Sequence, residues 1–178
     1  MIFNNTWIKF VDFLLGQAAW WGCLLSARAG WEGIAPLPPL FYAALHLVLR
    51  RGERSAVLRA ALLAALFGAL ADSSLAFGGL ISFPGSLPCT RPWMVSLWAA
   101  FGVQLTFSLR AWATASLWAR VLSGALAGPL AYRAGAALSA LFLPRGLSSL
   151  AAISVVWALA LGILPVISKA RTDKGEEP

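Results

Sequence analysis

The sequence predicts an all-α polytopic membrane protein, a helical bundle with six transmembrane helices. The first observation is composition, since 60% of the 178 residues are hydrophobic and only 12% are charged. Soluble proteins average about 45–50% apolar and about 25% charged residues. A soluble domain of this size keeps much of its surface in water and could not bury so much apolar area. We therefore expect lipid to surround most of the chain.

The second observation is that six apolar windows approach the length of about 20 residues that a bilayer core requires. They are Phe10–Ala27, Ile34–Leu49, Val57–Gly78, Trp93–Ala113, Val121–Phe142 and Leu147–Ile167. The connections are short, which predicts one transmembrane domain over residues 1–168 and a short polar tail over residues 169–178. The second window is short and opens with Pro36, Pro38 and Pro39, so a five-span arrangement with that segment half-inserted stays open.

The third observation is the distribution of basic residues. With the N-terminus placed inside, ten of the 14 Lys and Arg residues fall in inner segments. Only Arg28, Arg91 and Arg145 fall in outer segments, and Arg133 lies within the fifth window. The positive-inside rule therefore predicts that both termini are cytoplasmic. Basic residues placed between apolar runs do not form a nucleic-acid surface, so we expect no nucleic-acid partner.

Two ionisable residues, Asp72 and Arg133, fall deep inside predicted helices. Each follows an inner basic residue by 13 positions, which at about 1.5 Å per residue places both about 20 Å from the inner surface. We expect an Asp72–Arg133 ion pair, either as a structural lock between the third and fifth helices or as part of a polar ligand pocket. Tyr132 adjoins Arg133, and Glu32 at the outer mouth is a further candidate for the pocket.

Small residues mark the faces on which these two helices pack. Gly68 precedes Asp72 by one turn, and Gly124, Gly128 and Gly135 line the fifth window. The Gly-x-x-x-Gly spacing of Gly124 and Gly128 is typical of close helix contacts in membranes. Pro129, in the middle of the window, removes one backbone hydrogen bond and is expected to kink the helix.

Other polar residues are secondary candidates. Asp12 and His46 fall at the same depth near the inner face, where they could form a proton-relay pair or make separate interfacial contacts. Gln104 is expected to make an interhelical hydrogen bond. Cys23 and Cys89 have no metal-type spacing, and the sequence leaves open whether they form a disulfide.

No enzyme motif stands out, since H-E-x-x-H, G-x-S-x-G and a phosphate-binding glycine loop are all absent. One histidine and two cysteines make protein-bound zinc or haem a poor expectation, so we predict no metal and no cofactor. The catalytic residues, if there are any, stay unknown at this stage.

Several short motifs run along the chain. They include Trp20, His46, Gly68-x-x-x-Asp72, Gly78, Pro92-Trp93, Leu97-Trp98-x-x-Phe101, Ser108-Leu109-x-x-Trp112 and Gly128-Pro129-Leu130-Ala131-Tyr132-x-x-Gly135. With these motifs the chain resembles the bacterial inner-membrane proteins of domain-of-unknown-function family 2878, from the first helix to the sixth. The resemblance implies a multi-pass protein of the bacterial inner membrane, and it points towards membrane lipids.

The functional expectation is therefore a non-catalytic protein that binds lipid or assists membrane-lipid handling. Its expected partners are membrane lipids and a lipid-modifying enzyme, and the oligomeric state stays open. The pocket is expected around Asp72, Tyr132 and Arg133, with Arg133 holding an anionic head group. Two alternatives remain: a small intramembrane enzyme acting on lipid, and a small transporter that uses an Asp/Arg polar pocket.

Overall fold

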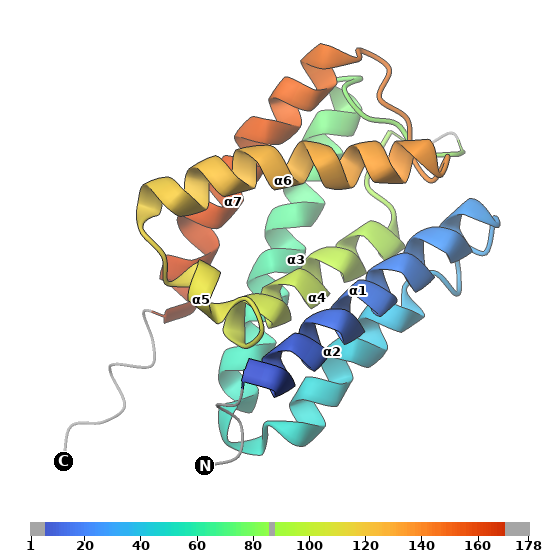
Figure 1. Cartoon of the computed structure of the whole chain (residues 1–178). Coiled ribbons are helices and arrows are strands. Elements are labelled where there is room, and N and C mark those ends of the chain that lie inside the picture. The colour runs from blue at the N-terminus through green and yellow to red at the C-terminus, as the bar shows by residue number, and fades with distance from the viewer. Residues whose placement is uncertain (1–5, 86–87, 170–178) are drawn as a thin grey trace.

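The computed structural model describes residues 6–85 and 88–169, and this part of the chain folds as an all-α bundle (Figure 1). The α-helices are α1 (Thr6–Arg28), α2 (Leu37–Leu49), α3 (Arg54–Phe77), α4 (Pro92–Thr106), α5 (Arg110–Ala113), α6 (Leu117–Ala137) and α7 (Leu147–Lys169). A 3-10 turn, η1 (Arg51–Glu53), joins α2 to α3. The predicted fold class is confirmed at the level of an all-α protein with membrane-like helices. Except for Lys169, the predicted polar tail lies outside the described residues.

Three stretches of the described chain are long and apolar enough to cross a membrane. They are Thr6–Arg28, Arg51–Phe77 and Leu147–Val166, and Leu37–Leu49 is a shorter apolar helix. The three stretches coincide with the first, third and sixth predicted windows. The glycines and arginines of α6 lower its hydropathy, and α4 is only 15 residues long.

The expected fourth helix over Trp93–Ala113 is wrong in one respect, because the structure breaks it. Helix α4 ends at Thr106, and Phe107 leaves helical geometry with φ −137° and ψ −87°. The chain then forms the four-residue α5, and α6 starts after Ser116, whose hydroxyl accepts a hydrogen bond from the amide of Ala119 at 3.3 Å. Serine is a favoured N-cap, because its oxygen satisfies a free amide in the first turn.

Leucines face outwards on the long helices, and small residues face inwards. On α3 the exposed leucines recur every fourth residue, at Leu58, Leu62, Leu66 and Leu70. The opposite face of α3 buries residues that include Ala60, Ala64, Gly68 and Asp72. Helix α6 repeats this pattern, with Leu122, Leu126 and Leu130 exposed and Gly124, Gly128 and Gly135 buried. An apolar outer surface over a small-residue interior is the arrangement of helices that pack in lipid.

The helices pack most extensively in two pairs, α3 with α4 and α6 with α7. Helix α1 packs against α2 and α4, and α3 also contacts α7. In Figure 1, α1 and α6 lie on the near side of the bundle, and α3 lies behind them. Helix α4 therefore lies between α1 and α2 on one side and α3 on the other, and α3 in turn contacts α7.

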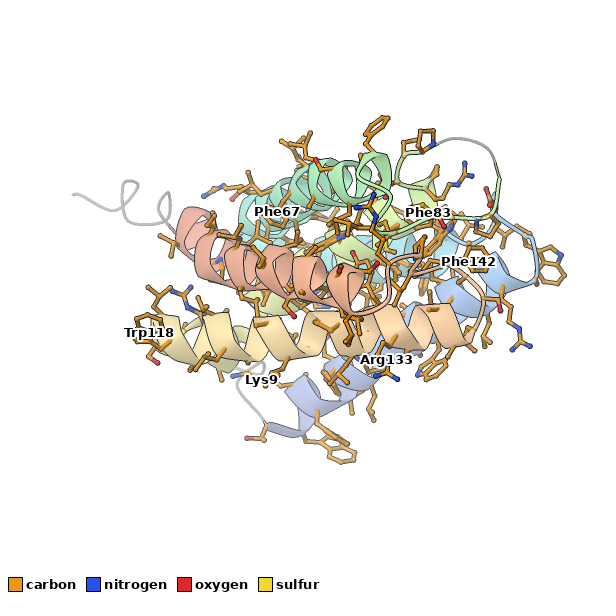
Figure 2. All side chains as sticks on the ribbon, turned by 90° about the horizontal axis from the view of Figure 1, so that it is seen from above. Lys9, Phe67, Phe83, Trp118, Arg133 and Phe142 are labelled. Carbon is orange, nitrogen blue, oxygen red and sulfur yellow. The ribbon has the colours of Figure 1, made fainter. Side chains whose placement is uncertain are left out.

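The segments that follow α3 and α6 meet each other and share a local conformation. Gly79 and Ser139 end the two helices with positive φ angles of 64° and 58°. Beyond them, Ser82 and Phe142 form an antiparallel bridge with backbone hydrogen bonds of 3.0 and 2.7 Å. Phe83 and Phe142 mark this junction in Figure 2. The bridge fixes one end of α3 beside one end of α6. A hydrogen bond in the interior, between Asp72 of α3 and Tyr132 of α6, also joins these two helices.

Candidate functional site

The interior contact joins Asp72 to two aromatic side chains. Asp72 is fully buried on α3, at 0% exposure. Trp98 of α4 donates its indole N–H to Asp72 Oδ2 at 2.9 Å, and the Tyr132 hydroxyl of α6 donates to Oδ1. A buried carboxyl group needs such donors, because burying a charge without a partner is very unfavourable. Asp72 thus holds α4 and α6 against α3.

The expected Asp72–Arg133 ion pair is wrong. Successive residues on an α-helix point about 100° apart, so a helix that turns Tyr132 towards Asp72 turns Arg133 away. Arg133 is exposed, and Figure 2 shows it on the side of α6 that faces away from α3. Within the described residues the ion pairs are His46–Asp12 and Arg50–Glu53.

Glycines bring the tryptophans next to these helices. A Cβ atom on Gly68 would lie 2.0 Å from Cγ of Trp98, and one on Gly128 would lie 2.2 Å from Cγ of Trp157. Each indole ring therefore occupies space that any larger residue would fill. The two rings pack against each other, with centroids 4.9 Å apart and planes tilted by 35°. Gly124 similarly admits the backbone of α7, and Gly135 lies against Leu141.

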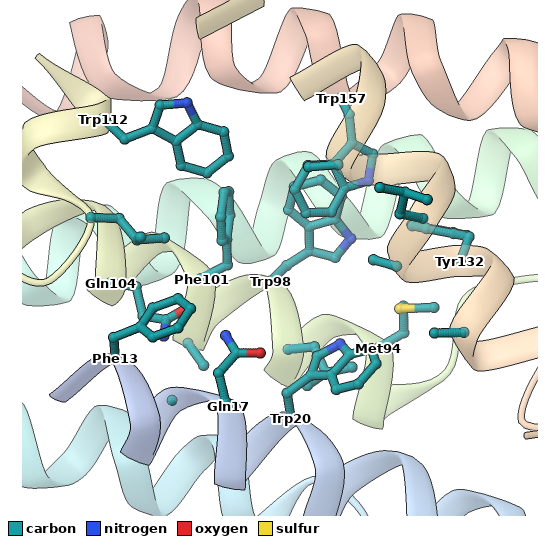
Figure 3. Close-up of a pocket in the computed structure, with 18 residues that line it drawn as sticks. Phe13, Gln17, Trp20, Met94, Trp98, Phe101, Gln104, Trp112, Tyr132 and Trp157 are labelled. Atoms are coloured by element: carbon teal, nitrogen blue, oxygen red, sulfur yellow. The ribbon is translucent and has the colours of Figure 1, made fainter. Parts of the chain in front are cut away.

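A cavity of about 400 Å³ opens beside this centre, lined by residues of α1, α4, α6 and α7 and of the α4–α6 connection. Aromatic side chains form much of its wall, and Figure 3 shows Trp20, Trp98, Phe101, Trp112 and Trp157 around it. Tyr132 also lines it. Asp72 does not, because Trp98 and Tyr132 lie between its carboxyl group and the cavity. Asp72 is therefore a positioning residue for the cavity wall.

A second polar centre lies between α1 and α2. Nε2 of His46 lies 2.7 Å from Oδ1 of Asp12, and the Tyr42 hydroxyl donates to Oδ2 of Asp12 at 3.0 Å. All three side chains are buried. Arg50, at the end of α2, donates to the Thr106 hydroxyl at 2.8 Å and so ties this region to α4. The depth estimate from sequence had placed Asp12 and His46 at one level, and the structure brings them together.

The remaining candidates lie apart from both centres. Glu32 is half-buried in the turn between α1 and α2 and is not among the residues lining the cavity. Pro129 lies inside α6, which continues through it. Both cysteines are free thiols, and Cys23 is buried with its Sγ 3.7 Å from the carbonyl oxygen of Trp93.

Gln104 lines the cavity, where its amide packs against Gly16. The expected interhelical hydrogen bond is missing for its Nε2 atom, which is buried and has no partner in the part of the chain that the structure describes.

Two features of these sites were not predicted from the sequence, although a signal for the first of them was present. Tyr42 precedes His46 by one helical turn, so the two side chains share a face of α2, and that spacing could have placed both beside Asp12. Trp157 gives no such signal, because a tryptophan in an apolar helix is unremarkable by itself. Only the packing of α7 against Gly128 shows its role in the cavity wall.

The chemistry available at the two centres differs. The cavity offers apolar and aromatic surface with the amides of Gln17 and Gln104, which suits binding of an apolar molecule. The Asp12–His46 pair is an arrangement in which a carboxyl group orients an imidazole, as in general acid–base sites. Over residues 6–85 and 88–169, no three His, Cys, Asp or Glu side chains are grouped as a metal site would need.

Comparison with characterised proteins and with solved structures gives no match. A family model, that of the protein of unknown function DUF2878, matches residues 9–163. The matched range includes both polar centres and every residue that lines the cavity. The chain therefore belongs to the DUF2878 family.

Proposed function

We propose that this protein is a multi-pass protein of the bacterial inner membrane that binds a lipid in its aromatic cavity without catalysing a reaction. The cavity carries the proposal. Its volume of about 400 Å³ lies within the range of about 300–1,000 Å³ typical of small-molecule sites. Cavities of about 150 Å³ already bind benzene, so this one accommodates a much larger apolar molecule. Burial of each methylene group of such a ligand contributes about 0.8 kcal/mol.

The proposal includes six crossings and cytoplasmic termini. The excess of basic residues on the predicted inner side supports this topology. The outward-facing leucines of α3 and α6 support a lipid environment for both helices. In this topology Cys89 lies on the outer side, so a membrane-impermeant maleimide is expected to label Cys89 in intact cells, and not Cys23, which is fully buried. Labelling of Cys89 only after the inner face is opened would contradict the topology.

Lipid binding is tested by filling the cavity. Ala131 of α6 lines it, whereas Leu126, five residues earlier on the same helix, is 70% exposed on the outer surface. We expect native mass spectrometry of the detergent-purified protein to show a retained lipid in the wild type and in Leu126→Phe, and loss of that lipid in Ala131→Phe. Equal lipid retention in both variants, or none in the wild type, would refute the proposal.

A second candidate function, a small enzyme acting on lipid, is favoured by one observation. Asp12, His46 and Tyr42 form a buried hydrogen-bonded group next to a cavity of about 120 Å³ that Arg50 also lines. In this case His46→Gln would abolish a change in cellular lipid composition that overexpression of the wild-type protein causes. Retention of that change in His46→Gln would exclude this role for His46. We do not propose a transporter built on an Asp72–Arg133 pocket, because Asp72 is fully buried whereas Arg133 is exposed.

A partner enzyme fits the accessory role expected from the sequence. Co-purification of the wild-type protein with a lipid-modifying enzyme, and loss of that enzyme when the cavity is filled in Ala131→Phe, would support it. Retention of the enzyme by the filled variant would show that the association does not depend on the bound lipid.

A further inference from the structure

The polar side chains among the described residues that line the cavity are all uncharged: they are two glutamine amides, four indole N–H groups and the hydroxyl of Tyr132, which is bonded to Asp72. Gln17 of α1 and Gln104 of α4 both line it, and Figure 3 shows the amide of Gln17 directed into the space between the aromatic rings. Within the described residues, Gln104 Nε2 and Trp157 Nε1 are buried without hydrogen-bond partners. A buried donor without a partner costs about 1–3 kcal/mol, so a ligand that supplies an acceptor recovers this loss.

The amide of Gln104 is able to reach such a ligand. Its Nε2 lies in the space left by Gly16, where a Cβ atom would be only 1.8 Å away. Rotation about the last torsion of a glutamine side chain is soft, since the bond joins an sp³ to an sp² carbon. A modest turn of the amide therefore presents the N–H to the cavity, beside Gln17.

Among the residues that the structure describes, no charged side chain lines the cavity to neutralise a charged ligand. None of its 18 lining residues is Asp, Glu, Lys, Arg or His. Asp72 is separated from the cavity by Trp98 and Tyr132, which donate hydrogen bonds to it, and Arg133 is on the outer surface. An ion placed in an apolar site without a countercharge is strongly disfavoured. The anionic head group expected from the sequence has no partner here.

The shape of the cavity restricts the size of the ligand. Trp98, Phe101 and Trp157 form a continuous aromatic wall, with ring centroids 4.9 Å apart for the two tryptophans and 5.1 Å apart for Phe101 and Trp157. Such a wall is rigid, since each side chain has only two rotatable torsions and packs against its neighbours. A volume of about 400 Å³ between rigid walls suits one hydrocarbon chain better than the two chains of a phospholipid.

We propose that the cavity selects an amphiphile with a single hydrocarbon chain and an uncharged, hydrogen-bonding head, such as a hydroxyl or an ester carbonyl, which Gln17 and Gln104 bind. This inference rests on the proposed lipid-binding function and names the chemical class of the ligand. The neighbouring groove between α2, α3 and α4 provides a contrast. It has a similar volume of about 430 Å³ but an almost wholly apolar lining, in which the Ser96 hydroxyl is already bonded to the Trp93 carbonyl. Apart from Ser96, the described residues that line this groove have no polar side chain that could distinguish one head group from another.

The test uses three probes with the same dibrominated stearyl chain, ending in a hydroxyl, in a sulfate ester or in no head group. Bromine quenches tryptophan fluorescence at short range, and Trp20, Trp98, Trp112 and Trp157 line the cavity. Titrations use the full-length protein in detergent, and the Ala131→Phe variant gives the quenching of tryptophans outside the cavity. We expect the alcohol to quench at about tenfold lower concentration than the sulfate or the hydrocarbon, a ratio equivalent to about 1.4 kcal/mol.

The amides are tested by the double variant Gln17→Leu with Gln104→Leu. We expect it to bind the hydrocarbon at least as well as the wild type does, and to lose the preference for the alcohol. Hydrocarbon binding at the same time shows that the variant is folded. Equal quenching by all three probes in the wild type, a preference for the sulfate, or an unchanged preference in the double variant would each overturn the inference and leave the lipid-binding function standing. If each of the three probes quenches the wild type no more than it quenches Ala131→Phe, the lipid-binding function itself is overturned.

Discussion

Replacing Tyr132 by phenylalanine removes one hydroxyl group and keeps the aromatic ring that packs between α6 and α3. Asp72, at 0% exposure, then keeps only the hydrogen bond from Trp98. Leaving a buried acceptor short of a donor costs about 1–3 kcal/mol, and measured interhelical hydrogen bonds within membranes reach about 1.7 kcal/mol. We therefore expect Tyr132→Phe to lower the free energy of unfolding by about 1–2 kcal/mol.

The neighbouring residue provides the control. Arg133 is exposed, so we expect Arg133→Ala to change the free energy of unfolding by no more than about 0.5 kcal/mol. The assay is reversible unfolding in mixed micelles with increasing dodecyl sulfate. In an Asp72→Ala background the Tyr132 hydroxyl has lost its acceptor, and Tyr132→Phe should then be neutral or stabilising. An equal loss from Tyr132→Phe in both backgrounds, or a loss from Arg133→Ala as large as that from Tyr132→Phe, would refute this account.

Two further predictions concern the packing of the helices. A Cβ atom on Gly124 would lie 2.5 Å from the backbone oxygen of Trp157, so Gly124→Ala should force α6 from α7 and lower the unfolding free energy by about 1–3 kcal/mol. Gly33→Ala, which meets nothing within 4 Å, should change it by less than about 0.5 kcal/mol, and similar losses for both variants would contradict the packing. His46→Ala leaves Asp12 with one donor fewer and should loosen α1 from α2, which hydrogen exchange of the two helices would report. Unchanged exchange in both helices would show that this contact does not hold them together.

The sequence alone determined the all-α class and most helix positions, because hydrophobic windows and basic flanks are local features. It also brought Asp12 and His46 to one level, since depth along a helix follows from counting residues. The break at Phe107 was missed because no glycine or proline marks it. The N-cap at Ser116, which starts the next helix, was a local signal that could have been used.

Only the tertiary structure decided which side chain meets Asp72. Residues 132 and 133 have almost the same depth in the bundle, but they differ by about 100° in direction, and direction depends on how α6 is rotated about its axis. That rotation is set by the packing of Gly124 and Gly128 against α7, a contact between segments distant in the chain. The same packing places Trp157 in the cavity wall and leaves Arg133 outside. This packing leaves an aromatic cavity without charged lining residues beside the buried Asp72–Tyr132–Trp98 contact, as far as the described residues show. The sequence could not show this arrangement, because the depth of a residue can be counted along a helix but the rotation of the helix about its axis cannot.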